Sequence, residues 1–409
     1  MTKHLQRLAI ASVIACTAAA QTAEPEAPAS LQEAIAKGKV SLNARLRYEH
    51  VDQPATDADA LTLRTRLGYT TGSYHGFTAG VEAQNTTQLV DDYQEPGQTA
   101  TGHSVVADPE LTEVSQAWIG YVNKDYGTSA KVGRQVIILD NARFVGNVGW
   151  RQNMQTFDAV TLKNSSVEKL DLTYAYLWKV KRIFGNPPGA AFTDFDSNSH
   201  LINAAYSGLP IGKLTAYTYL LDLENAAGFG SSSATYGLSL IGSKPLGDSG
   251  VTLGYRAEYA TQSDYGDNPA DYDADYYVAE LTAGYKGFSL KLGHEVLGSD
   301  GGVAAFQTPL ATGHAFNGWA DIFLTTPATG LRDTYVAFSA PIPGGVKATV
   351  AYHKFEADSG GADYGDEVDF VATYKINKNL GLIAKIALYN ADTFGVDTDK
   401  FSLQADYAF

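Results

Sequence analysis

Residues 39–51 read KVSLNARLRYEHV, and residues 61–70 read LTLRTRLGYT. In the first stretch apolar side chains occupy the even positions, from Val40 to Tyr48, while polar side chains such as Arg45 occupy the odd positions. Strict alternation of this kind is typical of a β-strand whose two faces meet different surroundings. Neither stretch shows the 3.6-residue period of a helix. We therefore predict two β-strands here.

The same two-faced pattern recurs as far as the C-terminus, for example in 251–259, 277–285, 288–292, 346–352 and 401–409. With weaker cases included, we find about 18 such segments of roughly ten residues, an even number of the length that a tilted membrane strand needs. Beyond the N-terminus no window approaches the ~18–20 apolar residues of a membrane helix. The chain therefore either is soluble or crosses a membrane as strands.

The connections between these segments alternate in length. Short links are predicted at 72–76, 123–127, 208–212, 245–250, 286–287, 341–345 and 377–379, and long polar links at 86–110, 139–155, 182–198, 262–275, 298–330 and 356–366. Short turns on one rim and long loops on the other are typical of transmembrane β-barrels.

The direction of the apolar face decides between two all-β classes. A closed sheet of about 18 strands encloses far more space than its inward side chains can fill, so an apolar face turned to lipid resolves the difficulty. We predict an all-β protein, a transmembrane antiparallel β-barrel of about 18 strands over residues 39–409. A soluble β-sandwich or propeller is the alternative, but a propeller would repeat at a fixed period, and none is seen.

The N-terminus predicts export. Residues 1–20 have a positive start, an apolar run and a small-residue cleavage site, which together indicate a signal peptide. Residues 21–38 are then a periplasmic leader with one possible short helix. Cys16 is the only cysteine and lies in the signal, where it could instead be lipidated as in a lipoprotein. We predict a bacterial outer-membrane location.

Charge and the C-terminus point to partners. The formal net charge of −15 excludes a nucleic-acid binder on bulk electrostatics. The last strand ends on Phe409, which resembles the signal read by the barrel-assembly machinery of bacterial outer membranes. The expected partners are therefore outer-membrane lipid, small hydrophilic solutes and that machinery.

The polar face of the strands would line a water-filled lumen. Its predicted cations are Arg45, Arg47, Arg64, Arg66, Arg256, Lys291 and Lys347. The first four share one patch of wall, because they lie on neighbouring strands. Such a patch favours anions through a pore, and arginine can hold a carboxylate through two hydrogen bonds. The alternative is that lumen acids such as Glu49 and Glu82 pair with these cations.

The stretch 133–158 has no strand period in its middle and carries Gly133-Arg134-Gln135, Arg143-Phe144-Val145-Gly146 and Trp150-Arg151-Gln152. It resembles the signature of the alginate-export family of outer-membrane porins. A second block, from Leu292 through Trp319 to Leu324, resembles the same branch of porins. The resemblance implies a monomeric barrel of about 18 strands whose basic lumen passes anionic saccharides or small anions. The residues themselves leave monomer and trimer open.

Within this stretch, residues 139–155 join the fifth and sixth strands on the long-loop rim. We predict that they fold inward and narrow the pore, with Arg143 and Arg151 facing solute and Phe144 and Trp150 anchoring the loop to the wall. The alternative is a loop packed above the barrel, its arginines neutralised by acids of its own stretch, Asp140 and Asp158. By its parity, Arg134 lies on the apolar face unless a bulge intervenes.

Sites of other kinds have weak support. Asp271, Asp273 and Asp275 could supply oxygen ligands to Ca²⁺, but the stretch lacks the glycine and distal glutamate of an EF-hand, so a solvated acidic loop is favoured. The histidines stand in no hydrolase or metalloprotease motif, and His314 is interpreted as a loop-packing residue. We expect no cofactor and no enzyme. The sequence predicts a passive channel for small hydrophilic, anionic solutes, with a general diffusion porin as the alternative and an exported β-protein enzyme as a remote one.

Overall fold

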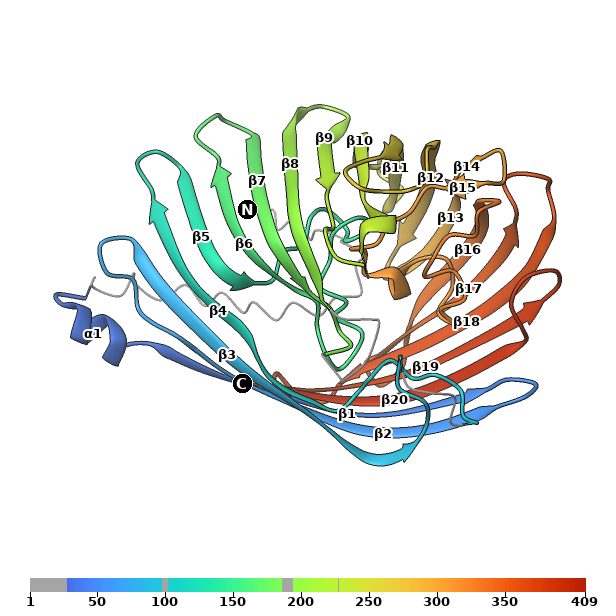
Figure 1. Cartoon of the computed structure of the whole chain (residues 1–409), viewed down its shortest axis with the longest axis horizontal. Coiled ribbons are helices and arrows are strands. Elements are labelled where there is room, and N and C mark those ends of the chain that lie inside the picture. Colours follow the sequence, from blue (N-terminus) through green and yellow to red (C-terminus); the bar gives the residue numbers. More distant parts are fainter. Residues whose placement is uncertain (1–27, 98–101, 186–193, 227) are drawn as a thin grey trace.

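The computed structural model describes residues 28–97, 102–185, 194–226 and 228–409. Within them, eighteen strands form one antiparallel sheet in which each strand pairs with its neighbours in sequence. The last strand, β20, pairs with the first, β1, and so closes the sheet (Figure 1). This confirms the predicted barrel. The predicted signal peptide, with Cys16, lies outside the described residues.

The strands of the first half of the wall are β1 (Lys39–Asp52), β2 (Asp57–Thr70), β3 (Phe77–Asp92), β4 (Leu111–Asn123), β5 (Thr128–Gln135), β6 (Thr156–Asn164), β7 (Leu170–Lys181), β8 (Phe195–Leu209) and β9 (Gly212–Leu221). Those of the second half are β10 (Ser233–Pro245), β11 (Val251–Asp264), β12 (Asp273–Tyr285), β13 (Phe288–Leu297), β16 (Leu331–Ile342), β17 (Val346–Glu356), β18 (Asp363–Lys375), β19 (Leu380–Ala391) and β20 (Thr398–Ala408). A small hairpin, β14 (Ser299–Asp300) and β15 (Ala304–Ala305), and the 3₁₀ turns η1 (Phe229–Ser231) and η2 (Gly313–Ala315) lie in the loops.

One short α-helix, α1 (Leu31–Ala36), precedes the barrel and lies at one rim of it, beyond the start of β1 (Figure 1). The side chain of Ser30 caps the helix by accepting a hydrogen bond from the backbone N–H of Glu33 at 3.1 Å. The hydroxyl of Tyr69 on β2 donates to the carbonyl of Ile35, which ties the helix to the wall. In the described part of the chain, no helix is long and apolar enough to cross a membrane.

Alternation in the sequence becomes two faces of the wall. Apolar side chains on the outer face stay exposed, for example Leu281 at 65% and Leu67 at 55%, as a lipid-facing surface requires.

The short turns have the backbone conformations that tight hairpins need. Lys286 and Gly287 both have positive φ, 47° and 91°, which is the backbone of a two-residue hairpin turn between β12 and β13.

The inner face is less polar than the sequence predicts. Loops enter the barrel and pack their apolar residues, including Val145, Phe306 and Leu310, against inward wall residues such as Leu201 and Phe355, all at most 1% exposed. A barrel of this width would otherwise hold open water, so the inserted loops give these wall residues an apolar surface to contact. The interior therefore contains a packed core beside its charged surface.

Four predicted loops are shorter than expected, namely 86–110, 182–198, 262–275 and 356–366, because neighbouring strands extend into them. The stretch 262–275 is divided, because β11 continues to Asp264 and β12 begins at Asp273, so Asp273 and Asp275 belong to a strand. Asp271, Asp273 and Asp275 are exposed at alternate positions. Successive same-face residues of a strand lie about 6.4–6.8 Å apart, too far for three carboxylates to converge on one ion.

Candidate functional site

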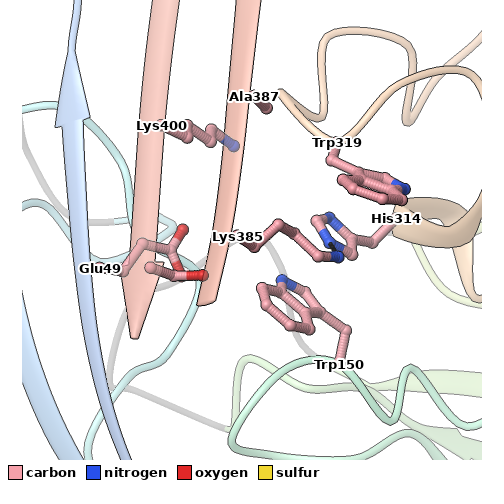
Figure 2. A pocket seen from close by; sticks show the side chains of 8 residues that line it. Glu49, Trp150, His314, Trp319, Lys385, Ala387 and Lys400 are labelled. Atoms are coloured by element: carbon pink, nitrogen blue, oxygen red, sulfur yellow. Dashed lines mark hydrogen bonds between the residues drawn. The ribbon is translucent and has the colours of Figure 1, made fainter. Parts of the chain in front are cut away.

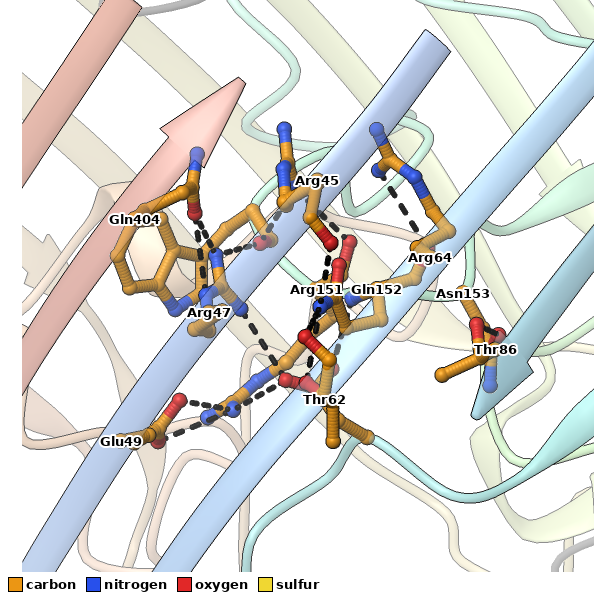
Figure 3. Close-up of polar contacts among 12 residues, drawn as sticks. Arg45, Arg47, Glu49, Thr62, Arg64, Thr86, Arg151, Gln152, Asn153 and Gln404 are labelled. Carbon is orange, nitrogen blue, oxygen red and sulfur yellow. Dashed lines mark hydrogen bonds and ion pairs between the residues drawn. The ribbon is translucent and has the colours of Figure 1, made fainter. Parts of the chain in front are cut away.

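The residues joining β5 and β6 run into the barrel and meet the four arginines of β1 and β2, which we call the arginine patch: Arg45, Arg47, Arg64 and Arg66. Figure 3 shows Arg45, Arg47 and Arg64 on the wall strands beside Arg151 and Gln152 of the loop. Arg45 donates from Nη1 to the carbonyls of Gly149 and Trp150, both at 3.0 Å.

The remaining members of the patch reach the same loop segment. Arg47 also donates to the carbonyl of Trp150. Arg66 donates from Nη2 to the carbonyl of Gln152 at 3.0 Å, and Arg64 reaches the same oxygen at 3.5 Å. The patch therefore binds a row of backbone oxygens from residues 149–152 inside the lumen.

The patch is only partly neutralised by carboxylates. Arg45 pairs with Asp406 at 2.7 Å, and Arg47 pairs with Asp108 at 3.2 Å. The partners of Arg64 and Arg66 are neutral side chains and loop carbonyls, and neither has a carboxylate within 4.0 Å among the described residues. Two of the four positive charges therefore lack a direct counter-charge.

Strand pairing explains why these charges crowd together. Arg45 and Arg64 are opposite each other in the β1–β2 ladder. Arg64 is 2% exposed, and its Nε has no hydrogen-bond partner in the described part of the molecule. A buried guanidinium donor without an acceptor is costly, so this position favours an incoming oxygen atom.

Arg151 fixes the loop to both the wall and a second loop. Its Nη1 donates to both carboxylate oxygens of Glu49 on β1, at 3.1 and 2.9 Å (Figure 3). Its Nη2 donates to Asp321 in the loop 298–330 at 2.9 Å. Burial alone would lower the pKa of Arg151, but the charges of Glu49, Asp108 and Asp321 outweigh it and raise this pKa above its usual range.

Arg143 makes the corresponding contact on the other side of the lumen. Its Nε donates to Glu295 on β13 at 2.8 Å, its Nη1 to Thr308 at 3.0 Å and its Nη2 to Asn317 at 3.1 Å. Arg143 and Arg151 are 3% and 5% exposed, so both lie inside the barrel but neither faces open water. This corrects the expectation that they face solute: buried guanidinium groups require acceptors, and the wall acids provide them.

The alternative partners are also wrong. Asp140 accepts from Asn203 at 2.8 Å and lies 3.4 Å from the ammonium of Lys213, while Asp158 pairs with Arg134 at 2.8 Å. Arg134 shares its side of β5 with Val132, which is 46% exposed, so it lies on the outer face as its parity indicates. The loop arginines are thus neutralised by acids distant in sequence.

Phe144 is packed among aromatic side chains of the wall. Its ring centroid lies 5.2 Å from Tyr217, 6.0 Å from Tyr219 and 5.3 Å from Tyr276, and it is 5.9 Å from Phe306 of the second loop. Tyr276 in turn donates to Glu295 at 2.7 Å, the same carboxylate that binds Arg143. Phe144 therefore packs against wall residues of β9 and β12, which is the position that an anchor of the loop would take.

Trp150 lies in a stack of rings and cations at the centre of the site (Figure 2). Its ring is parallel to that of His314 at 4.4 Å, and the ammonium of Lys385 on β19 is 3.8 Å from the Trp150 centroid and 4.2 Å from that of Trp319. Lys385 lies 2.7 Å from Nε2 of His314, whose Nδ1 is 2.7 Å from Asp321.

His314 is therefore a connecting residue between the second loop and the wall. Burial is the main cause that lowers its pKa to about 3, and the positive charge of Lys385 adds to this, although Asp321 acts in the opposite direction. The imidazole is neutral at ordinary pH, so Nε2 can accept a hydrogen bond from the Lys385 ammonium while Nδ1–H donates to Asp321.

The remaining predicted lumen cations lie apart from this cluster. Arg256 pairs with Glu258 at 2.5 Å and Lys291 with Glu280 at 3.0 Å, on β11 to β13. Lys347 on β17 has no side-chain ion pair within the described ranges. Arg256 on β11 and Lys291 on β13 lie on the far side of the closed sheet from β1 and β2, and β17 with Lys347 is separated from β1 by β18, β19 and β20.

Sequence reasoning missed several residues of the site, namely Asp108, Gln152, Asn153, Trp319, Asp321 and Lys400. Trp319 and Asp321 stand in the second porin-like block, so that block carried a usable signal. Asp108 accepts from the backbone of Gln152 at 2.7 Å, and nothing in its local sequence indicates this. Among the residues that the structure describes, no group of three or more His, Cys, Asp or Glu is placed to hold a metal ion, and this includes Asp271, Asp273 and Asp275.

A closed barrel with an apolar exterior and a charged, loop-filled interior defines the class of outer-membrane channels. The sequence model of the alginate export family matches residues 39–276, which is more than half of the chain, and the chain belongs to this family. It resides in the bacterial outer membrane, in contact with lipid, and passes small solutes; the family is one of channels and not of enzymes. No curated protein matches the chain in sequence.

Solved structures confirm the architecture. OccAB2 of Acinetobacter baumannii superposes with a TM-score of 0.72 at 18% identity, over 92% of this chain and 98% of that one. OpdK of Pseudomonas aeruginosa, in a structure with vanillate, gives 0.72 at 15% identity over 92% and 99%. OccK9 (OpdG) of the same organism gives 0.72 at 18% identity over 92% and 99%. At such identities the likeness establishes the fold.

Proposed function

We propose that the channel favours small hydrophilic anions, acidic saccharides or organic carboxylates, which diffuse passively past the arginine patch. The observation that carries this proposal is the set of partners of the patch. Its guanidinium groups bind loop carbonyls and neutral side chains more often than carboxylates, and Arg64 and Arg66 have no carboxylate partner in the described residues. A passing carboxylate offers the same groups a stronger, charge-assisted bond.

The loop 139–155 is the constriction in this proposal. Its segment 149–152 is bound to the patch, and Arg143 and Arg151 fix its two sides to wall acids. Solute therefore passes where loop and patch meet. The chemistry of one fold neighbour is compatible with this, because OpdK was solved with vanillate, a small aromatic carboxylate.

A general diffusion porin is the second candidate, and a specific observation favours it. Arg143, Arg151, Arg256 and Lys291 are each paired with a glutamate at 2.5–3.1 Å, so much of the lumen charge is cancelled locally. The two candidates differ in whether Arg64 and Arg66 act on ions in transit.

The test is the reversal potential of the purified chain in a planar bilayer under a KCl gradient. The anion channel requires a chloride-selective potential in the wild type that moves toward zero in the variant Arg64→Gln/Arg66→Gln. The matched control Lys244→Gln/Lys286→Gln removes the same charge outside the lumen and should keep the wild-type potential. A wild type without selectivity, or an unchanged potential in the patch variant, would establish the general porin instead.

Assembly carries a related proposal. Phe409 is 66% exposed at the end of β20, where a terminal aromatic can be recognised by the barrel-assembly machinery, and its backbone pairs with Leu42 on β1. Phe409→Ala should reduce the amount of folded barrel in the outer membrane, measured by heat-modifiable electrophoretic mobility. An unchanged amount would refute this role.

A monomer is the oligomeric state that we propose, and cross-linking in the membrane distinguishes it from a trimer.

A further inference from the structure

A second group of cations lies near the rim formed by the short turns, away from the arginine patch. Lys131 on β5 and Lys163 on β6 share the inward face of the wall. Gln135, on the same side of β5 as Lys131, donates and accepts hydrogen bonds inside the barrel. Ala159, on the same side of β6 as Lys163, belongs to the interior core. In the β5–β6 ladder Ser129 is opposite Lys163 and Lys131 is opposite Thr161. Diagonal neighbours of this kind lie about 7–8 Å apart.

Neither lysine has a carboxylate partner. No ion pair within 4.0 Å involves Lys131 or Lys163 in the described ranges, and their charges are close enough to repel each other. Arg143, Arg151 and Arg256 are paired with glutamates, and Arg64 and Arg66 bind loop carbonyls and neutral side chains. Two adjacent unpaired ammonium groups on an inward wall are therefore unusual within this molecule.

Trp118 on β4 holds Lys131 in place. The ammonium of Lys131 is 4.2 Å from the centroid of the Trp118 ring, a cation–π contact. The ring itself lies flat on the wall, because a Cβ added at Gly80 of β3 would come within 2.5 Å of it, and one at Gly120 within 3.3 Å. The two glycines thus leave the space that the indole fills, and the indole fixes the lysine.

A cavity opens beside Lys163, the diagonal neighbour of Lys131. It has a volume of about 500 Å³ and lies between the β4–β5 and β6–β7 turns, with Ser129, Lys163 and Thr173 among its lining residues. Asp171 is the carboxylate in this lining, and it is not within ion-pair distance of Lys163. The space is sufficient for a monosaccharide-sized solute, and ligand pockets of proteins are commonly about 300–1,000 Å³.

We propose that Lys131 and Lys163, with Trp118 positioning Lys131, form a second anion-binding site at the periplasmic mouth of the lumen. It takes the carboxylate of an acidic sugar or another small organic acid, between the two ammonium groups. This rests on the proposed anion channel and adds a separate station to it. Two weak sites in series let a solute enter and leave more readily than one tight site.

Single-channel recording tests the site, with glucuronate as the anionic probe and glucose as its neutral counterpart. Glucuronate added on the short-turn side should interrupt the current of the wild type, and glucose should not. Lys131→Gln/Lys163→Gln should raise the half-blocking concentration of glucuronate by about fivefold or more, the effect of losing partly exposed ion contacts. Lys131→Arg/Lys163→Arg should restore it to about the wild-type value, because arginine keeps the charge and also stacks on aromatic rings.

Two further variants complete the design. Trp118→Leu should give a smaller rise than the double lysine variant, since the charges remain but Lys131 loses its support. The control Lys286→Gln removes a lysine that lies 5.1 Å from the ring of Tyr285 in another short turn, and it should behave as wild type. An anion-selective reversal potential together with unchanged glucuronate block in the double lysine variant would overturn the second site. A wild type without anion selectivity would overturn the proposed function itself, so the two failures are distinguishable.

Discussion

Removing the guanidinium of Arg143 should release the inserted loop while leaving the barrel intact. In the variant Arg143→Met, Glu295 remains buried at 3% exposure without its positive partner, and Thr308 and Asn317 each lose a hydrogen bond. Breaking a buried ion pair from one side costs about 3–5 kcal/mol. The sheet does not depend on this contact, because the barrel is held by its own strand pairing.

That free energy acts on the loop equilibrium. A cost of about 3–5 kcal/mol raises the population of the released loop by roughly a hundred- to several-thousand-fold, at 1.4 kcal/mol for each factor of ten. The expected result in 1 M KCl is a larger and noisier single-channel conductance than that of the wild type.

The control is Arg332→Met, which breaks the partly exposed pair of Arg332 with Asp358 at 2.9 Å. An exposed pair contributes about 0–1 kcal/mol, so this variant should conduct as the wild type does. Arg143→Met/Glu295→Gln should be less open than Arg143→Met, because no orphaned carboxylate remains. Wild-type conductance and noise in Arg143→Met would refute the reasoning that this ion pair holds the loop.

Three more predictions concern the same inserted segments. Burial lowers the pKa of His314 to about 3 while the loop is inserted, and release into water restores a value near 6.5. The inserted form is therefore fully stable above pH 6.5 and loses about 2 kcal/mol by pH 5. Conductance should rise as the pH falls, and a wild-type pH profile in His314→Gln would contradict this. Phe144→Ala should loosen the loop by about 3–5 kcal/mol through lost aromatic packing, measured as faster tryptic cleavage within residues 139–155, and an unchanged rate would count against the anchor. Gly318→Ala should displace its segment, because the residue has φ +83° and an added Cβ would lie 2.3 Å from Oε2 of Glu367. Tryptophan fluorescence should therefore change in this variant. In the control Gly344→Ala, at φ +90° but in open space, the fluorescence should be unaltered.

The wall was predictable because its information is local. Alternation in residues 39–51 indicates which side chains face lipid. Apart from the closing pair of β1 with β20, every strand pairs with its neighbours in the chain, so no long-range choice of partner is needed. The stretch 262–275 shows where local reasoning was wrong. Its aspartates suggested a loop, but alternation continues through Asp273 and Asp275 on the exposed face, and an exposed rim accepts carboxylates on a strand.

The interior was predictable only in outline. The inward position of residues 139–155 followed from their composition and place in the order of strands. Their partners did not, because Glu295 is 152 residues from Arg143 and Glu49 is 102 residues from Arg151. Several acids on the lumen face were equally plausible partners. Which acid is used depends on how two loops pack together, and single-sequence patterns do not carry that information.

The origin of the loop's partners has a consequence for how the protein matures. The loop after β5 binds Glu49 on β1 through Arg151, Glu295 on β13 through Arg143, and Lys385 on β19 through Trp150. Its binding partners therefore lie on strands from opposite ends of the chain. These strands come together only when β20 joins β1. The complete set of partners of the loop therefore exists only after closure, and we expect the loop to settle in a later step with its own rate. Until then the lumen of a new barrel is expected to be wider than that of the finished protein, and each molecule would pass through that open stage once.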